Sequence, residues 1–286
     1  MRSIFLIALA LSLQWPNAWA KEGKALNQWG QWRGPLQNGV APHANPPLQW
    51  SESEYIQWKV PIPGKGLSTP VIWDNRVFLT TAISVGKAKQ SIKGPAAGAH
   101  NNMPALYEHR FMVIALDRHT GKILWQKLAH AAQPHEATHV TGSWASQSPV
   151  TDGEVVCASF GSAGIYCYTV KGALLWKKDL GDMEIFHGHG EGSSPVLHDQ
   201  TLVVNWDHQG ASFVVALDKS TGKLIWKTPR DEITSWSTPL VVEFGKTMQV
   251  IISATKRIRS YNLQSGKEIW GCGGLSRNVV ASPVSS

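Results

Sequence analysis

A short motif that ends in a glycine turn and a tryptophan recurs along the chain at nearly constant spacing. The segment FMVIALDRHTGKILW ends at Trp125, and FVVALDKSTGKLIW, almost the same, ends at Trp226. Degenerate copies end at Trp176 and Trp270, so the four tryptophans lie 44 to 51 residues apart. A repeat of this length limits the chain to architectures that stack one supersecondary unit upon the next, such as solenoids and propellers.

A second marker precedes each of these tryptophans. It consists of a hydroxyl residue, a proline and an apolar residue, and it returns once more near the end of the sequence. The marker begins at Thr69, Ser148, Ser194, Thr238 and Ser282.

Between marker and tryptophan, short apolar runs alternate with turn chemistry. Asp74-Asn75, Asp152-Gly153 and Asp199-Gln200 each follow the first run of a unit, and such pairs tolerate the left-handed backbone of a hairpin turn. The 14 tryptophans, 26 glycines and only 16% charged residues suit many short strands joined by tight turns. We therefore predict an all-β protein made of four-stranded antiparallel propeller blades.

The markers delimit about four complete blades, at residues 68–126, 147–177, 193–227 and 237–271. Residues 56–60 are predicted to form the last strand of one partial blade, and residues 281–284 the first strand of another. The propeller domain is expected over 56–286, as part of an intact protein of seven or eight blades.

The first unit carries an insertion, which we place at residues 82–108. It contains Lys87, Lys89 and Lys93 with little apolar patterning. Insertions in repeat proteins map to loops on one face, often the binding face. The segment is either a plain surface loop or a cap that helps to select a partner.

The recurring tryptophans are interpreted as fasteners. Each indole ring can pack on the neighbouring blade while its N–H donates to a backbone carbonyl. The aspartate accepts backbone N–H groups in the turn, and the glycine supplies a positive φ. The residues assigned to this docking motif are Ala115, Asp117, Gly121, Trp125, Gly172, Trp176, Ala216, Asp218, Gly222, Trp226, Gly266 and Trp270.

The N-terminus has the layout of a secretory signal peptide. One positive charge, an apolar run over residues 4–13 and a small-residue tract ending at Ala20 predict a signal peptide at 1–20, followed by a lead-in segment at 21–55. No later run is long enough to span a membrane. We expect a periplasmic or secreted protein without a transmembrane anchor.

Export permits disulfides. Cys157 and Cys167 flank a probable turn, so they are either disulfide-bonded across two strands or packed as free thiols. Cys272 then has no evident partner.

The segment His187-Gly188-His189-Gly190-Glu191 is the most pointed local signal for a metal, with His198 and His208 nearby. In an extended strand His187 and His189 would lie on one side, about 7 Å apart, as two metal ligands do. The alternative is a glycine-rich loop whose histidines form hydrogen bonds at the rim.

The pattern Ala-x-Asp-x-x-x-Gly-Lys-x-x-Trp, at 115–125 and 216–226, resembles the tryptophan-docking motif of the pyrroloquinoline-quinone-like (PQQ-like) repeat family. That family includes quinoprotein alcohol dehydrogenases and the outer-membrane assembly lipoprotein of the BAM complex. In the dehydrogenases, the resemblance implies a quinone stacked on a tryptophan, beside calcium and under a vicinal disulfide. This chain has no adjacent cysteine pair, but Glu191, Asn205 and Asp207 could supply oxygen ligands to calcium.

The motif holds blades together and touches no cofactor, so it predicts fold better than function. The sequence contains no Gly-x-Ser-x-Gly, His-Glu-x-x-His or phosphate-loop motif. The net charge of the chain is +7. Its basic residues are dispersed along the sequence, which argues against nucleic-acid binding. We expect a non-catalytic scaffold that binds a protein or polymer on a propeller face; the alternative is a PQQ- and calcium-dependent dehydrogenase.

Overall fold

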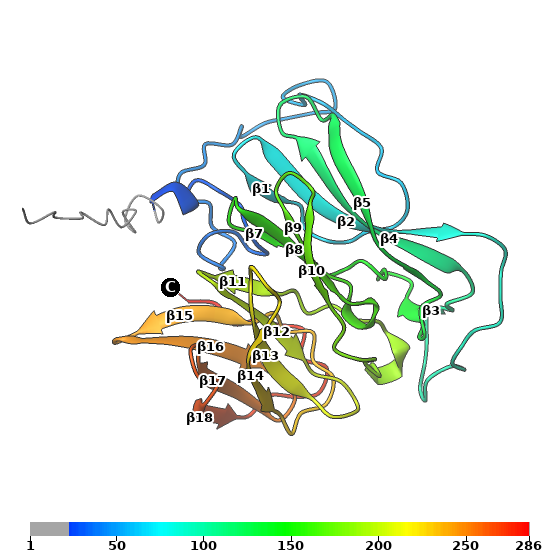
Figure 1. The fold of residues 1–286 in the computed structure, drawn as a ribbon, viewed down its shortest axis with the longest axis vertical. Coiled ribbons are helices and arrows are strands. Elements are labelled where there is room, and N and C mark those ends of the chain that lie inside the picture. Colours follow the sequence, from blue (N-terminus) through cyan, green and yellow to red (C-terminus); the bar gives the residue numbers. More distant parts are fainter. Residues whose placement is uncertain (1–22, 286) are drawn as a thin grey trace, which may run out of the picture.

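The computed structural model describes residues 23–285, so the expected signal peptide at 1–20 lies outside the described residues. Four four-stranded antiparallel sheets follow one another along the chain, as blades of a β-propeller (Figure 1). In each sheet the strands lie side by side in chain order, except that the small strand β3 is left out of the first. The all-β, bladed architecture predicted from the repeat is confirmed.

The blades have the following strands. Blade 1 contains β1 (Val71–Trp73), β2 (Arg76–Val85), β4 (Glu108–Asp117) and β5 (Ile123–Ala132), and blade 2 contains β7 (Val150–Thr151), β8 (Val155–Ser159), β9 (Ile165–Thr169) and β10 (Leu174–Lys178). Blade 3 contains β11 (Val196–His198), β12 (Thr201–Trp206), β13 (Phe213–Asp218) and β14 (Leu224–Pro229), and blade 4 contains β15 (Leu240–Phe244), β16 (Thr247–Ser253), β17 (Arg257–Asn262) and β18 (Glu268–Gly273). Outside them lie the pair β3 (Asn102–Met103) and β6 (Thr138–His139), and the 3₁₀ turns η1 (Gly161–Ala163) and η2 (Phe186–Gly188).

The hydrophobic core lies between adjacent blades. One cluster joins blades 1 and 2, another joins blades 2 and 3, and a third joins blades 3 and 4. The middle strands are therefore buried on both faces, and they are near-continuous apolar runs instead of alternating ones. In β13 the first five residues are all buried.

At the outer strands of blades 1, 2 and 3, a tryptophan fastens its blade to the next one. The indole N–H of Trp125 donates to the carbonyl of Val170 at 3.1 Å, and that of Trp176 to Lys219 at 2.7 Å. Trp226 in blade 3 reaches the carbonyl of Leu263 in blade 4 at 2.8 Å. The ring in each case lies on the turn glycine of the following blade.

Trp270, which the motif also assigns to docking, behaves differently. Its indole donates to Gln249 Oε1 within its own blade, and 40% of the residue is exposed. The described residues contain no further blade for it to meet. Trp58, which the motif assignment does not include, makes the equivalent contact at the other side of the array: its indole N–H donates to the carbonyl of Arg118 at 2.8 Å, and its ring lies on Gly121.

Segments 56–60 and 281–284, expected as lone strands, belong to none of the described sheets. Without neighbouring strands to pair with, their backbones form no ladder. Both nevertheless carry a fastening residue, Trp58 in the first and Ser282 in the second.

A second fastening runs along the first strands. The hydroxyl of each marker residue after Thr69 accepts the backbone N–H of the preceding marker residue, at 2.9 to 3.1 Å. The donor–acceptor pairs are Thr69 to Ser148, Ser148 to Ser194, Ser194 to Thr238, and Thr238 to Ser282. A hydroxyl residue stands before the proline because its oxygen accepts a hydrogen bond from the neighbouring blade.

The lead-in segment lies along the first strands of the blades, drawn in blue in Figure 1. Trp29 forms a bridge with Ile72 of β1. Thr151 of blade 2 donates its backbone N–H to the carbonyl of Gly30 at 2.7 Å. The amide of Gln37 then accepts the backbone N–H of Val241 in blade 4 at 3.2 Å. One short segment therefore contacts blades 1, 2 and 4.

The insertion of the first unit is shorter than the expected 82–108. Strand β2 continues to Val85 and β4 begins at Glu108, so the connection comprises residues 86–107. Paired residues extend both strands past the ordinary blade length. Within the connection β3 pairs with β6, which ties the insertion to the segment between blades 1 and 2.

Cys157 and Cys167 lie opposite each other in β8 and β9 and are disulfide-bonded. Cys272 is a free, exposed cysteine. The disulfide closes the hairpin around η1, which presents Ser162 to the site described next.

Candidate functional site

A cavity of about 460 Å³ lies where the first strands of the blades begin. Hydroxyl residues from three blades, Ser148, Ser194 and Thr238, line one part of it, and the indoles of Trp32 and Trp236 line another. Trp236 is held in place because its N–H donates to the carbonyl of Gly190 at 2.7 Å. Aromatic faces beside hydroxyl groups can bind a ligand with both apolar and polar parts.

A second cavity, of about 250 Å³, adjoins the first. Its apolar lining includes Phe111, Trp144 and Phe160, and its polar lining includes His135 and Glu136. Gly190 and Glu191 line both cavities.

Glu191 lies between the two cavities and is turned toward η1. Its carboxylate accepts the backbone N–H of Ser162 at 2.9 Å and also the hydroxyl of Ser162. A side chain at Gly161 would overlap the carboxylate, so glycine is required there. Desolvation of the carboxyl group raises the pKa of Glu191 to about 7, against the opposing effect of the bonds from Ser162.

Glu136 is the second acidic group of this region. It accepts the backbone N–H of Ile185 at 3.1 Å, and its carboxylate lies 3.8 Å from Nε2 of His135. Burial raises the pKa of Glu136. Both carboxyl groups are therefore weaker acids than usual.

The sequence left open whether His187 and His189 lie in an extended strand or in a glycine-rich loop, and the structure places them in the loop. They belong to the turn at η2, where His187 has φ 57°. Their ring centroids are nevertheless 5.5 Å apart. Glu191, the third candidate of that set, is directed away to Ser162 and does not join them.

The two other histidines of this part of the chain have separate structural contacts. Nδ1 of His208 accepts the backbone N–H groups of Glu184 and Gly210, each at 3.2 Å. His198 lies 3.6 Å from the carboxylate of Asp199 at the surface.

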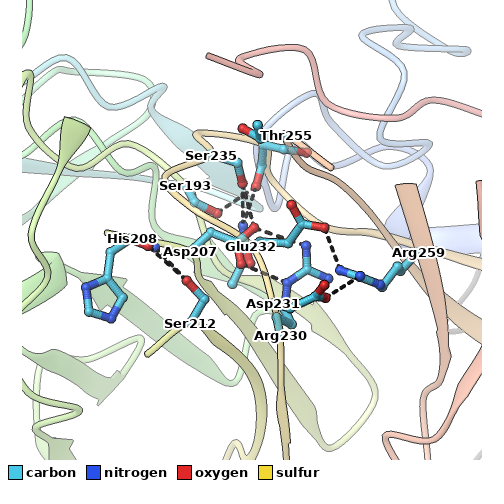
Figure 2. Close-up of polar contacts among 12 residues, drawn as sticks. Ser193, Asp207, His208, Ser212, Arg230, Asp231, Glu232, Ser235, Thr255 and Arg259 are labelled. Carbon is cyan, nitrogen blue, oxygen red and sulfur yellow. Dashed lines mark hydrogen bonds and ion pairs between the residues drawn. The ribbon is translucent and has the colours of Figure 1, made fainter. Parts of the chain in front are cut away.

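Asp207, one of the three candidate calcium ligands, already has other partners. Figure 2 shows this carboxylate facing Arg230 and Ser235. Nε of Arg230 donates to Oδ1 at 2.7 Å and Nη2 to Oδ2 at 3.0 Å, while the hydroxyl of Ser235 donates to Oδ2 at 2.7 Å. Both side chains of the ion pair are fully buried.

Asn205 keeps one unused acceptor nearby. Its Oδ1 atom is buried without a hydrogen-bond partner, and the small cavity that it lines with Glu191 and Asp207 measures about 10 Å³. That volume suits one water molecule. Because a guanidinium neutralises Asp207 and the pKa of Glu191 is raised, these residues do not fit a calcium ion, which prefers several ionised oxygen ligands.

The disulfide also differs from the arrangement that a quinone site implies. Cys157 and Cys167 are buried in the core between blades 2 and 3. Neither residue lines the cavity at the first strands.

The motif-based assignment did not include three residues that the structure makes prominent. Trp58 is a docking tryptophan, and its signal was its place in the short strand-like segment 56–60 that precedes the first unit. His100 and His139 lie beside His189, with ring centroids 4.7 and 5.0 Å from it. No short-range spacing connects these histidines, because they come from different connections.

Residues 168–284 match the profile of the family described as outer membrane protein assembly factor BamB. This matching part of the chain, from blade 2 to the last described segment, is therefore similar to PQQ-like β-propeller repeats. No curated protein matches the chain.

Two solved dehydrogenases have a similar fold over most of this chain. A europium-containing methanol dehydrogenase is 12% identical to this chain, with a TM-score of 0.51. The alignment covers 89% of this chain and 60% of the dehydrogenase. A quinohemoprotein alcohol dehydrogenase from Pseudomonas putida is 13% identical, with a TM-score of 0.50, and the alignment covers 89% of this chain and 41% of that protein. BamB from Moraxella catarrhalis is 15% identical, with 60% and 51% covered and a TM-score of 0.41.

This chain thus spans between 41% and 60% of the length of these structures. Among its described residues, none of the helices has the length and apolar character needed to cross a membrane.

Proposed function

We propose that the chain is an exported, non-catalytic binding scaffold that holds a protein partner. The observation that carries this proposal is the apolar surface of the lead-in segment. Leu48 is 95% exposed, Trp50 67% and Tyr55 73%. Clustered exposed aromatic and aliphatic side chains mark protein interaction sites, and Trp and Tyr are enriched in such interfaces.

Two further observations support a scaffold. The motif tryptophans Trp125, Trp176 and Trp226 are used in fastening one blade to the next. The matching family is described as an assembly factor of the outer membrane, which agrees with a periplasmic location and with binding of other proteins.

The partner is tested by photo-crosslinking in cells that export the chain. A photoreactive phenylalanine analogue at Trp50 should give a discrete adduct, whereas the same analogue at Asp199, whose side chain is 89% exposed, should give none. Replacing both Leu48 and Tyr55 by serine should weaken the Trp50 adduct. Equal adducts at both positions, or none at Trp50, would contradict the proposal.

The alternative, a PQQ- and calcium-dependent dehydrogenase, shares the fold. Purified protein incubated with the quinone and calcium is assayed for dye reduction with a panel of alcohols and sugars. We expect no turnover above that of free quinone. Robust turnover would contradict the scaffold proposal and support the dehydrogenase.

A further inference from the structure

Four histidines from three separate connections meet at one edge of the cavity. The ring centroid of His100 lies 4.7 Å from that of His189, 5.5 Å from that of His187 and 6.4 Å from that of His139. His189 lies 5.0 Å from His139 and 5.5 Å from His187. We call these four residues the histidine cluster.

The backbone holds the cluster together. The pairing of β3 with β6 brings the insertion that carries His100 beside His139. Nδ2 of Asn102 then donates to the carbonyls of His187 and Gly188, at 2.7 and 3.0 Å. The insertion is thereby fixed against the turn at η2.

Two of the rings have a defined tautomer. Nδ1 of His100 lies 2.9 Å from the carbonyl of Gly98, and Nδ1 of His187 lies 2.9 Å from the carbonyl of Ala97. A carbonyl oxygen only accepts, so Nδ1 carries the proton in both neutral rings and Nε2 carries the lone pair. Metal-binding histidines are typically held in this way, with one nitrogen on a backbone carbonyl and the other on the ion.

The other two rings complete the set. Nδ1 of His139 lies 2.8 Å from the hydroxyl of Thr141 and accepts the backbone N–H of Thr141 at 3.3 Å, so the neutral ring carries its proton on Nε2. For Nε2 to bind an ion, the proton would shift to Nδ1 and be donated to the hydroxyl of Thr141. Nε2 of His189 is buried without a hydrogen-bond partner. A buried polar atom without a partner is costly, and a bound ligand would satisfy it.

The separations match those around a metal ion. With metal–nitrogen bonds of about 2.0–2.1 Å, imidazole centroids in a tetrahedral site lie roughly 5 Å apart. Among residues 23–285 no three His, Cys, Asp or Glu side chains are already arranged to hold a metal ion, so an ion would draw the Nε2 atoms together by side-chain rotation.

We propose that the histidine cluster, His100, His139, His187 and His189, binds one divalent transition-metal ion of the kind that prefers imidazole nitrogen, such as Zn²⁺ or Cu²⁺. The ion would join the insertion of blade 1 to the connections on either side of blade 2. His139 and His189 also line the cavity of about 460 Å³, so the metal lies at its edge and holds the insertion beside it.

The test is calorimetric titration of tag-free protein at pH 7.5 with Zn²⁺. We expect one ion per chain, with affinity lowered at least about tenfold in His189→Ala and in His100→Ala. His198→Ala, outside the cluster, is the matched control and should bind as the unaltered protein does. Ca²⁺ should not compete, because it prefers oxygen ligands.

Co²⁺ gives an independent readout. Tetrahedral coordination by nitrogen should produce visible absorption bands, which His100→Ala should abolish or shift. His100 is exposed, so this variant is expected to fold, as circular dichroism would verify, even if His189→Ala does not. Absence of zinc binding, or equal affinity in His100→Ala and the unaltered protein, would overturn the proposal.

Discussion

At the scale of single residues, the turn glycines meet two demands at once. Gly222 has φ 67°, and a Cβ atom there would lie 2.7 Å from the ring of Trp176. Gly245 has nearly the same backbone, φ 64°, but a Cβ atom there would have nothing within 4 Å. The pair separates backbone strain from steric contact.

We expect Gly245→Ala to cost about 1–2 kcal/mol, the strain of a left-handed residue. Gly222→Ala should cost about 1–3 kcal/mol more, because the methyl group displaces the docked tryptophan. Urea unfolding followed by circular dichroism measures both free energies. Equal losses would mean that Trp176 yields without cost.

Glu191 predicts how stability depends on pH. Its pKa is raised to about 7 in the folded protein, so the folded state binds the proton more tightly than the unfolded chain does. This contribution to stability is fully present below about pH 4 and is lost as the pH rises toward 7 and beyond.

Glu191→Gln should therefore flatten the fall in unfolding free energy between about pH 4.5 and 7.5. Thermal unfolding across that range, for the variant and the unaltered protein, provides the measurement. Parallel curves would show that the carboxyl group remains ionised in the folded state.

Sequence reasoning reaches some of these residues and misses others. The motif indicates a tryptophan that packs on a neighbouring blade, but it does not indicate that Trp176 meets Gly222. Of the histidine cluster, the local pattern indicates only His187 and His189. His100 and His139 come from connections whose meeting depends on β3, a strand of two residues.

At the scale of elements, blades 3 and 4 are joined by a buried charge network. Arg230, directly after β14, binds Asp207 and also donates from Nη1 to the hydroxyl of Tyr261 in β17 at 2.5 Å. Asp231, the next residue, instead binds Arg259 from a side chain that is 69% exposed. Figure 2 shows the two ion pairs together.

Asp207→Asn should lower the unfolding free energy by about 3–5 kcal/mol, because it leaves the buried guanidinium without a countercharge. Asp231→Asn, the matched change at an exposed carboxylate, should cost less than about 1 kcal/mol, because Arg259 keeps its ion pair with Glu232. Chemical unfolding of both variants compares them. Similar small losses would mean that water reaches Arg230.

The strand order was predictable because turn chemistry is local. Asp74 and Asp199 adopt the left-handed backbone expected of their hairpins, with φ 50° and 49°. The limits of the insertion were not predictable, because the outer parts of β2 and β4 pair beyond the usual blade edge.

At the scale of the whole molecule, the lead-in segment connects distant blades. Arg33→Ala combined with Gln37→Ala removes its side-chain bonds to Ser282 and to Val241. We expect hydrogen exchange at the amide of Val241 to rise about tenfold, since its acceptor is lost. The amide of Val250, buried within β16, should be unchanged. Unaltered exchange at Val241 would show that other contacts hold the segment.

The repeat predicted this architecture, since the period limits the fold to few choices. It could not predict the path of the lead-in segment. Trp29 and Gln37 lie outside the repeat, and their contacts in blades 1 and 4 depend on how the finished blades are arranged.

The path of the lead-in segment has a consequence for the order of folding. Residues 29–38 are synthesised before any blade, but their partners include Val241 and the carbonyls of Ser282 and Ser285. Contacts this distant in sequence form late. Trp29 can pair with Ile72 as soon as blade 1 has formed, but the contacts of Arg33, Gln37 and Asn38 can form only after the fourth blade and the segment that follows it have been made.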